Sequence, residues 1–230
     1  MSSIAALFDR ISHRYDVLNH LLSFNMDKAW RSKTAKEVAK SHPRSILDLA
    51  TGTADLAISL SKHNPQAHIV GLDISEKMLD IGKAKVKTQN LDNQIELRFG
   101  DAESLPCADD TFDAVTVAFG VRNFERLDQG LSEISRVLKP DGRAVILEFS
   151  MPERFPVKQV YRLYFKHILP KIGHWVSKDG NAYDYLPDSV EKFPKPDDFC
   201  KTLDSHGLHV VKARQLTLGV VTMYVTQKKA

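Results

Sequence analysis

The segment Ser45–Ala57 constrains the fold more than any other part of the sequence. It reads SILDLATGTADLA: a short apolar run, a break at Thr51-Gly52-Thr53, and a helical pattern from Asp55. These features predict a buried strand, a tight turn with one glycine, and a helix with polar residues at its start. A strand–turn–helix unit of this kind presents backbone N–H groups to a ligand above the carboxyl end of the strand. We therefore expect a cofactor-binding corner here.

The same alternation of strand and helix patterns continues along the next hundred or so residues. Strand patterns occur at 45–50, 68–73, 94–99, 111–119 and 143–149, and helical patterns occur at 55–62, after a capping Ser75, and at 127–138, where Pro140 and Gly142 should stop the helix. This order predicts a doubly wound α/β sheet of five parallel strands. Two more strand patterns, 209–216 and 219–227, predict a terminal antiparallel hairpin. The expected sheet therefore has seven strands, mostly parallel, with helices on both faces.

The chain is expected to form one domain with four parts. These are an N-terminal helical cover (1–42), a cofactor-binding core (43–150), an insertion on the substrate side (151–200) and the terminal hairpin (201–230). The cover should hold one helix within 4–22, interrupted by a polar cluster at 13–16, and a second from Trp30 to about Lys40. Two interpretations of these helices remain open: simple packing in front of the main fold, or a lid over the site.

Composition argues against several classes of protein. The chain has 32 Lys and Arg against 29 Asp and Glu, so no strong overall charge attracts nucleic acid. Its two cysteines, Cys107 and Cys200, are far apart and show no metal-ligand spacing, which argues against structural zinc and against a disulfide framework. No apolar run is long enough to span a bilayer, and the N-terminus does not resemble a signal peptide. A cytoplasmic protein without a metal is expected.

Acidic residues at the ends of successive strands indicate the cofactor. Asp48 lies in the first strand, Asp73 ends the second, and Asp101 follows the third. A carboxylate about twenty residues after a glycine turn can accept hydrogen bonds from both hydroxyls of a ribose. A single aspartate in such a place is more often a turn or helix cap, but three at successive strand ends are harder to explain in that way.

The loop between the first strand and its helix distinguishes among nucleotide cofactors. It contains one glycine instead of the GxGxxG pattern of nicotinamide enzymes, so it offers no cradle for a pyrophosphate. Asp48 and Asp55 flank the loop and would repel a phosphate, but they suit a cationic amino-acid ligand. S-adenosylmethionine has a ribose, an adenine, an ammonium and a sulfonium, and no phosphate. It is the favoured cofactor, and a nicotinamide-dependent dehydrogenase is the competing interpretation.

Seven motifs resemble the UbiE/MenG family of ubiquinone/menaquinone biosynthesis C-methyltransferases, and together they span almost the whole chain. They are FDRISHRYDVLNHLLSF at Phe8–Phe24, LDLATGTADLA at Leu47–Ala57, GLDISEKML at Gly71–Leu79, GDAESLP at Gly100–Pro106, FDAVTVAFGVRNF at Phe112–Phe124, RVLKPDGRAVILEFSMP at Arg136–Pro152 and YDYLPDSVEKFP at Tyr183–Pro194. One departure bears on the turn. Ala54 stands where the family often has glycine, and an alanine permits a tight turn there if its φ angle is negative.

The resemblance implies a class I, Rossmann-like, S-adenosylmethionine-dependent methyltransferase. It assigns cofactor contacts to Thr53, Asp73, Asp101, Ala102 and Ala118, and the turn itself favours close approach of a ligand to Gly52. The implied reaction is methyl transfer to a ring carbon of a polyprenylated quinol. Reduced demethylmenaquinone is the favoured substrate, and a benzoquinol of ubiquinone biosynthesis is the alternative.

The resemblance places Arg122 and Asn123 near the quinol oxygen. Our hypothesis is that Arg122 holds the quinolate, or a water that relays its proton, while Asn123 orients the ring; a plain salt-bridge role for Arg122 is the alternative. Tyr15, Asp16 and Asn19 are weaker candidates for covering the substrate or for proton removal. The apolar face of a helix near 157–169 could line a path for the isoprenoid tail or simply pack on the sheet.

The substrate also implies contact with a membrane. We expect peripheral association with the inner face of the cell membrane, and a homodimer remains open. Two other classes of protein fit the sequence less well. Methyltransferases of nucleic-acid bases typically carry an NPPY-like segment where this chain has AFGVRN, and a non-catalytic binding module would not need the Arg122-Asn123 pair.

Overall fold

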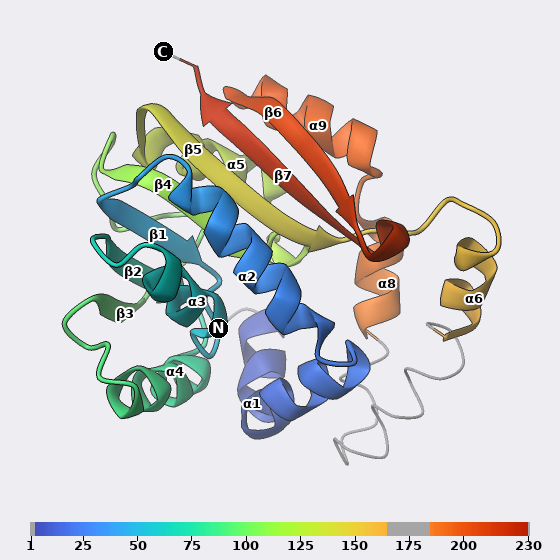
Figure 1. Ribbon diagram of the computed structural model, residues 1–230, viewed down its shortest axis with the longest axis horizontal. Coiled ribbons are helices and arrows are strands. Elements are labelled where there is room, and N and C mark those ends of the chain that lie inside the picture. Colours follow the sequence, from blue (N-terminus) through green and yellow to red (C-terminus); the bar gives the residue numbers. More distant parts are fainter. Residues whose placement is uncertain (1–2, 165–184, 230) are drawn as a thin grey trace.

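A seven-stranded sheet forms the centre of the molecule (Figure 1). The computed structural model describes residues 3–164 and 185–229. The strands lie in the order β3-β2-β1-β4-β5-β7-β6. Their bounds are β1 Ser45–Leu49, β2 His68–Asp73, β3 Ile95–Phe99, β4 Phe112–Ala118, β5 Leu138–Phe149, β6 Leu208–Leu216 and β7 Val221–Lys228. Strands β1 to β5 pair in parallel, and β7 runs antiparallel to both β5 and β6. The expected sheet with its terminal antiparallel hairpin is confirmed.

Helices cover both faces of the sheet, as the alternating pattern predicts. Their bounds are α1 Ser3–Leu22, α2 Met26–Ala39, α3 Asp55–His63, α4 Glu76–Thr88, α5 Leu127–Val137, α6 Val157–Leu163, α8 Tyr185–Lys192 and α9 Pro196–Ser205. Apolar side chains of α2, α3 and α4 pack with one face of the strands, and those of α5 and α9 pack with the other.

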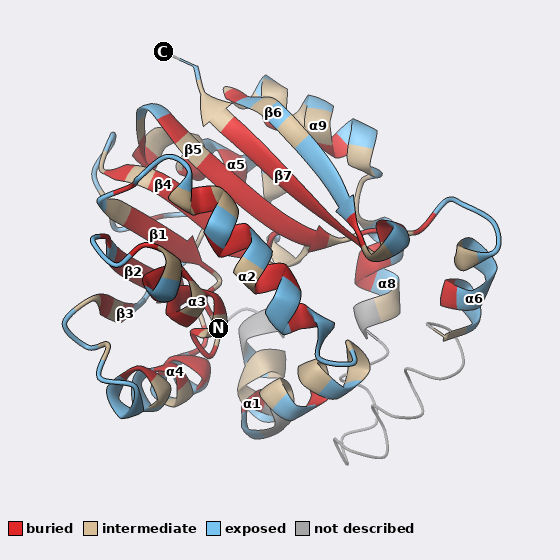
Figure 2. Cartoon of the chain, viewed as in Figure 1, coloured by how far each residue is buried: buried red, intermediate tan, exposed pale blue. Residues whose placement is uncertain are grey.

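Alternation within β1 shows how the sequence produces these two layers. Ile46 belongs to the cluster under α2, α3 and α4, whereas Leu47 and Leu49 belong to the cluster under α5 and α9. Successive side chains of a strand point to opposite faces, so a strand covered on both sides is apolar throughout. Figure 2 shows that the central strands are buried along most of their length. At the start of α4 the Ser75 hydroxyl accepts a hydrogen bond from the backbone N–H of Met78, which confirms the expected cap.

Several elements differ from the sequence-based expectation in their bounds or continuity. Helix α1 runs through residues 13–16 without a break, and α2 begins at Met26 instead of Trp30, directly after Asn25, whose φ is +60°. Helix α5 ends at Val137, within one residue of the expected bound, but β5 begins at once, so Pro140 and Gly142 lie inside the strand. The reason is that Leu138 already pairs with Phe112, and a register shift before Ala114 absorbs the intervening residues. Helix α6 ends at Leu163; part of the expected 157–169 helix lies outside the described residues.

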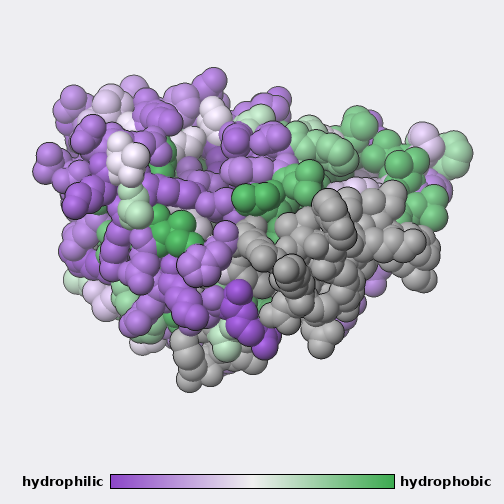
Figure 3. Space-filling model, turned by 90° about the horizontal axis from the view of Figure 1, so that it is seen from below, coloured by the Kyte–Doolittle hydropathy of each residue, from purple (hydrophilic) through white to green (hydrophobic). Residues whose placement is uncertain are grey.

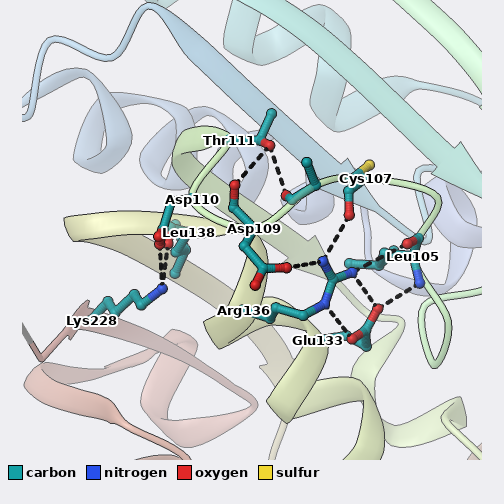
Figure 4. Close-up of polar contacts among 10 residues, drawn as sticks. Leu105, Cys107, Asp109, Asp110, Thr111, Glu133, Arg136, Leu138 and Lys228 are labelled. Atoms are coloured by element: carbon teal, nitrogen blue, oxygen red, sulfur yellow. Dashed lines mark hydrogen bonds and ion pairs between the residues drawn. The ribbon is translucent and has the colours of Figure 1, made fainter.

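Arg136 on α5 holds the connection between β3 and β4 (Figure 4). Its guanidinium donates to the backbone carbonyls of Cys107 and Leu105 and pairs with Asp109 at 2.7 Å. Glu133 accepts from Arg136 and from the backbone N–H of Leu105, each at 2.7 Å. This network fixes residues 105–109. They come shortly after Asp101 and Ala102, the two cofactor contacts expected just after β3.

Candidate active site

A cavity of about 340 Å³ opens at the carboxyl ends of β1, β2, β3 and β4. We call it the large cavity. This edge of an open parallel sheet is where such folds bind ligands. Five of the six residues expected to contact the cofactor line it: Gly52, Asp73, Asp101, Ala102 and Ala118. Tyr15 and Asn123, from the expected substrate and catalytic sets, line it too. The sheet therefore brings together residues from all the strand ends that the sequence singled out.

A second, small cavity of about 20 Å³ adjoins the large one. Tyr15, Ala50, Gly52 and Ala118 line both cavities, so the two share a wall at the turn after β1. Thr53 lines only the small cavity. Its hydroxyl donates to Asp16 at 2.6 Å and accepts from Lys85 at 3.0 Å, so this expected contact is already engaged by the chain.

Asp73 is held in place by backbone N–H groups. One carboxylate oxygen accepts from Gly52 at 2.7 Å and the other from Ser75 at 2.9 Å. Burial raises the pKa of Asp73, and these N–H groups oppose the rise. A carboxylate oxygen accepts more than one hydrogen bond. Asp73 can therefore still accept from two adjacent hydroxyls, as a ribose requires.

The turn after β1 adopts left-handed backbone angles at several residues. Ala50, Gly52 and Ala54 have φ angles of +50°, +55° and +65°. The condition considered for Ala54, a negative φ, is therefore not met, and the alanine occupies a conformation that glycine enters at lower cost. Close packing holds the turn: a Cβ atom on Gly120 would lie 2.5 Å from the Cβ of Ala50. The loops after β1 and β4 touch at this point and form the floor of the cavity.

The two carboxylates that flank the turn have different surroundings. Asp48 is 1% exposed and accepts hydrogen bonds from the hydroxyls of Thr51 at 2.7 Å and Thr116 at 2.6 Å. Burial raises the pKa of Asp48 to about 6 in spite of these bonds. Asp55 instead pairs with Lys85 at 2.7 Å, so its charge is matched within the protein. Of the two, Asp48 is better suited to receive a cationic ligand group.

Helix α1 lies over this edge of the sheet and is fastened there by polar contacts. Ser75 donates to Asp9 at 2.5 Å, and Asp16 pairs with Lys85 at 2.6 Å. Tyr15 faces both cavities, and burial raises its pKa. Asn19 lines neither cavity among the described residues but hydrogen-bonds to Tyr15. The geometry favours a cover over the site rather than helices that only pack beside it.

The expected catalytic pair is divided between the cavity and the wall behind it. Asn123 lines the large cavity, whereas Arg122 lines neither cavity. The Arg122 side chain is 7% exposed and pairs at 2.8 Å with the buried Glu148. It also donates to the carbonyl of Phe119 and to the hydroxyl of Ser189. A direct catalytic role for Arg122 stays a prediction; these contacts hold the loop that presents Asn123.

Sequence reasoning assigned Arg31 no role beyond the lid interpretation of the N-terminal helices, and the structure places it in the wall of the small cavity. Arg31 on α2 is buried, pairs with Asp27, and lies 5.5 Å from the centre of the Phe119 ring. The spacing of Asp27 and Arg31, four residues apart on a helix, was the available signal. That spacing alone does not tell a buried pair from an exposed one.

One group of potential metal ligands occurs among the described residues. His20, Asp27 and Asp55 bring ligand atoms within 4.8 Å of one another. Arg31 and Lys85 already neutralise the two carboxylates, which disfavours a cation there. The expectation of a reaction without a metal remains untested by this arrangement.

The sheet order and the cavity at the carboxyl ends of its strands give the fold of S-adenosylmethionine-dependent methyltransferases. A methyltransferase of this type from Aquifex aeolicus has the same fold, with a TM-score of 0.61 and 18% identity over 84% of this chain and 89% of that one. The putative methyltransferase in complex with the Trm112 activator of Haloferax volcanii has a TM-score of 0.67 and 17% sequence identity. The match covers 97% of this chain and 98% of that one. The carboxylates at the strand ends and the absence of a pyrophosphate cradle fit this cofactor.

The chain belongs to the ubiE/COQ5 methyltransferase family, whose sequence profile matches residues 2–228. A demethylmenaquinone methyltransferase of Bacteroides fragilis is 43% identical over 98% of this chain and 92% of its own length. One from Deinococcus radiodurans is 44% identical over 99% of this chain and 93% of its own length. The ubiquinone/menaquinone biosynthesis C-methyltransferase UbiE of Geotalea daltonii is 43% identical over 98% and 96%. The family resemblance drawn from the motifs is confirmed.

Proposed function

We propose that this protein methylates a ring carbon of reduced demethylmenaquinone and so produces menaquinone. The observation that carries the proposal is the match, along nearly the full length of both chains, to relatives named demethylmenaquinone methyltransferase. The large cavity supports it, because residues from four strand ends and from α1 line a single space of about 340 Å³ at the edge where such folds bind ligands. Methylation of a benzoquinol is the second candidate, favoured by the relatives named UbiE.

S-adenosylmethionine, when bound, would supply the methyl group from its sulfonium to the ring carbon and would itself be left as a neutral thioether. A ring carbon becomes nucleophilic when an adjacent hydroxyl of the reduced ring loses its proton, and the carbon later releases its own hydrogen as a proton. The protein must hold both partners in line and stabilise the developing oxyanion. In this proposal Gly52, Asp73, Asp101, Ala102 and Ala118 hold the cofactor.

Asn123 is the proposed contact to the quinol oxygen, because its backbone segment follows β4 and it lines the cavity. Arg122 acts through the loop: it fastens Phe119 and Glu148 behind the cavity wall. Tyr15, with Asn19 hydrogen-bonded to it, would cover the ring. Since burial raises the pKa of Tyr15, this phenol is a poor base at neutral pH.

The substrate's isoprenoid tail points to a lipid surface as the partner. No helix within residues 3–164 and 185–229 is long and apolar enough to cross a membrane. Exposed apolar side chains nevertheless gather around α6, where Figure 3 shows a hydrophobic area at one end of the molecule. Phe24, Phe155, Val160 and Leu163 are 74%, 81%, 64% and 59% exposed. Of the apolar face expected on this helix, Val160 therefore does not pack on the sheet, whereas Tyr161 is buried in a cluster with Phe149 at the end of β5.

Basic side chains accompany this apolar surface and complement anionic lipid. Arg154, Lys158 and Arg162 are exposed on and beside α6. Aliphatic and aromatic side chains flanked by such charges are typical of peripheral membrane contacts. We propose that this end of the molecule rests on the membrane that carries the quinol. In a vesicle flotation assay with anionic lipid, the double variant Val160→Ser/Leu163→Ser should remain unbound, whereas Val211→Ser, on the distant strand β6, should float as the wild type does.

The catalytic assignment is tested with purified protein, S-adenosylmethionine and two reduced acceptors, demethylmenaquinone and the benzoquinol precursor. Mass spectrometry of the products should show a mass gain of one methylene on the naphthoquinol ring. A gain only on the benzoquinol would replace the first candidate by the second. The quinones of cells that lack the protein give an independent readout, since demethylmenaquinone should accumulate.

A further inference from the structure

We propose that the small cavity receives the amino-acid end of S-adenosylmethionine and that Arg31 binds its carboxylate. The inference deepens the proposed function, because it rests on the use of that cofactor and assigns one part of it to a residue. It starts from the position of the small cavity. Asp73 and Asp101 line the large cavity only, whereas the small cavity adjoins it at Ala118 and the turn after β1.

The size of the small cavity limits what it can hold. At about 20 Å³ it admits only the tip of a chain and not a ring, so the rest of a bound chain would lie in the adjoining large cavity. A methionine end is an extended chain that terminates in an ammonium and a carboxylate on one carbon. A ligand whose ribose lies at Asp73 can reach past the shared wall of the two cavities with such a chain. The adenine and the quinol ring require the larger space.

The charges around the small cavity match both ends of an α-amino acid. Asp48 and Arg31 both line it, one an anion when deprotonated and the other a permanent cation. The ammonium suits Asp48, and the carboxylate suits Arg31. Asp55 also lines this cavity, but Lys85 pairs with it at 2.7 Å. Without Arg31, a carboxylate would have to enter a buried space lined by two aspartates, which is costly.

Arg31 is held in a way that leaves donors available. One terminal nitrogen donates to Asp27, and the guanidinium stacks on Phe119 at 5.5 Å. No described residue accepts a hydrogen bond from the other nitrogens of Arg31. A guanidinium presents two parallel N–H groups, a geometry that fits a carboxylate. Asp27 is a positioning residue here: it also accepts from Ser23 at 2.7 Å and lies 2.8 Å from His20.

The experiment compares two ligands that differ by one group. Decarboxylated S-adenosylmethionine keeps the adenine, ribose, sulfonium and amine and lacks only the carboxylate. Isothermal titration calorimetry on the full chain gives a dissociation constant for each ligand. The wild type should bind S-adenosylmethionine about 10- to 100-fold more tightly, the range expected for a charge-assisted pair. Arg31→Met should bind both ligands with nearly equal affinity, and Arg31→Lys should keep part of the preference.

Two further variants make the result decisive. Lys28→Met removes a positive charge from an exposed site on the same helix and should keep the full preference of the wild type. Asp27→Asn/Arg31→Met removes both members of the ion pair, so it should lose the preference even if Arg31→Met alone folds poorly. If Arg31→Met and the double variant lose affinity for both ligands by the same factor, the inference is overturned. It is also overturned if the wild type binds the two ligands with equal affinity. A wild type that binds neither ligand would overturn the cofactor assignment as well, and this outcome is distinct.

Discussion

Asp16 on α1 and Lys85 on α4 form an ion pair at 2.6 Å, and both side chains contact Thr53 in the turn after β1. Lys85 also pairs with Asp55, the first residue of α3, at 2.7 Å. One lysine thus joins the cover to the helix that follows the turn, and Asp16 reaches the turn itself through Thr53. Since the three charged side chains are about a quarter exposed, water screens the pair only in part.

Replacing Lys85 should loosen the cover. Lys85→Met leaves Asp16 and Asp55 without their cation, and we expect a loss of roughly 1 kcal/mol of stability, concentrated in the docking of α1. Hydrogen exchange followed by mass spectrometry should show faster exchange in residues 3–22 and little change in β1 or β4. Lys83→Met is the matched control, because Lys83 on the same helix lies 4.0 Å from an exposed Asp80. Equal exchange in the two variants would show that the pair does not hold the cover.

Close contact between the loops after β1 and β4 gives a second prediction. Gly120 has a φ of −113°, which alanine adopts without strain, so Gly120→Ala tests space alone. The added Cβ would lie 2.5 Å from the Cβ of Ala50, and overpacking of this kind costs about 1–3 kcal/mol. We expect urea denaturation to show that loss, together with weaker binding of S-adenosylmethionine.

The same contact supplies its own control. Ala50→Gly removes the opposing Cβ at a residue with a φ of +50°, a conformation that glycine adopts without steric strain. The double variant Ala50→Gly/Gly120→Ala should therefore regain most of the stability that Gly120→Ala loses. If the double variant is as unstable as the single one, the two loops do not touch in the way described.

Arg122 can be tested separately as a positioning residue and as a catalytic one. Glu148 is fully buried and Arg122 is its cationic partner, so Arg122→Ala should cost about 3–5 kcal/mol, the range for breaking a buried pair. In the Arg122→Ala background, Glu148→Gln should recover part of that loss, because it removes the orphaned charge. Denaturant unfolding measures both effects. An Arg122→Ala protein of unchanged stability that turns over far more slowly would instead point to direct catalysis.

The sequence predicted the sheet and the cofactor edge well, because both follow from local patterns. Continuous apolar runs such as β4 require a strand covered on both faces, and a strand end followed by an aspartate places that side chain at the ligand edge. The partners of charged side chains were less accessible to such reasoning. Lys85 and Glu148 contact residues that are distant in the chain, and Arg31 matters because it is buried at a cavity. The spacing of residues in the sequence reveals neither a distant partner nor burial.

Element boundaries depended on long-range pairing in the same way. Pro140 and Gly142 are good stop signals for a helix, but Leu138 pairs with Phe112 before either is reached. Strand pairing therefore starts β5 at Leu138, before the expected start at 143, although α5 itself ends within one residue of its expected bound. The left-handed Ala54 is a comparable case, since its φ is set by the packing of the turn and not by its own preference.

The raised pKa of Asp48 predicts how stability changes with pH. Burial raises this pKa to about 6 in the folded protein, from an ordinary value of 3.8 in an unfolded chain. Between these values the folded state retains a proton that the unfolded state releases, so acid favours the fold and stability falls as the pH rises through about 6. The Asp48→Asn variant has no such titration, and its amide can still meet the hydroxyls of Thr51 and Thr116.

The difference in unfolding free energy between Asp48→Asn and the wild type should therefore grow in favour of the variant by about 2–3 kcal/mol from about pH 4 to about pH 7.5. Chemical denaturation of both proteins at a series of pH values, without ligand, measures this difference, and titrations of groups that do not interact with Asp48 cancel between the two. A constant difference would mean that Asp48 is already ionised at pH 4. The same carboxylate should make binding of S-adenosylmethionine tighter above about pH 6 in the wild type, because an ammonium is attracted by the ionised form, and Asp48→Asn should lose that dependence.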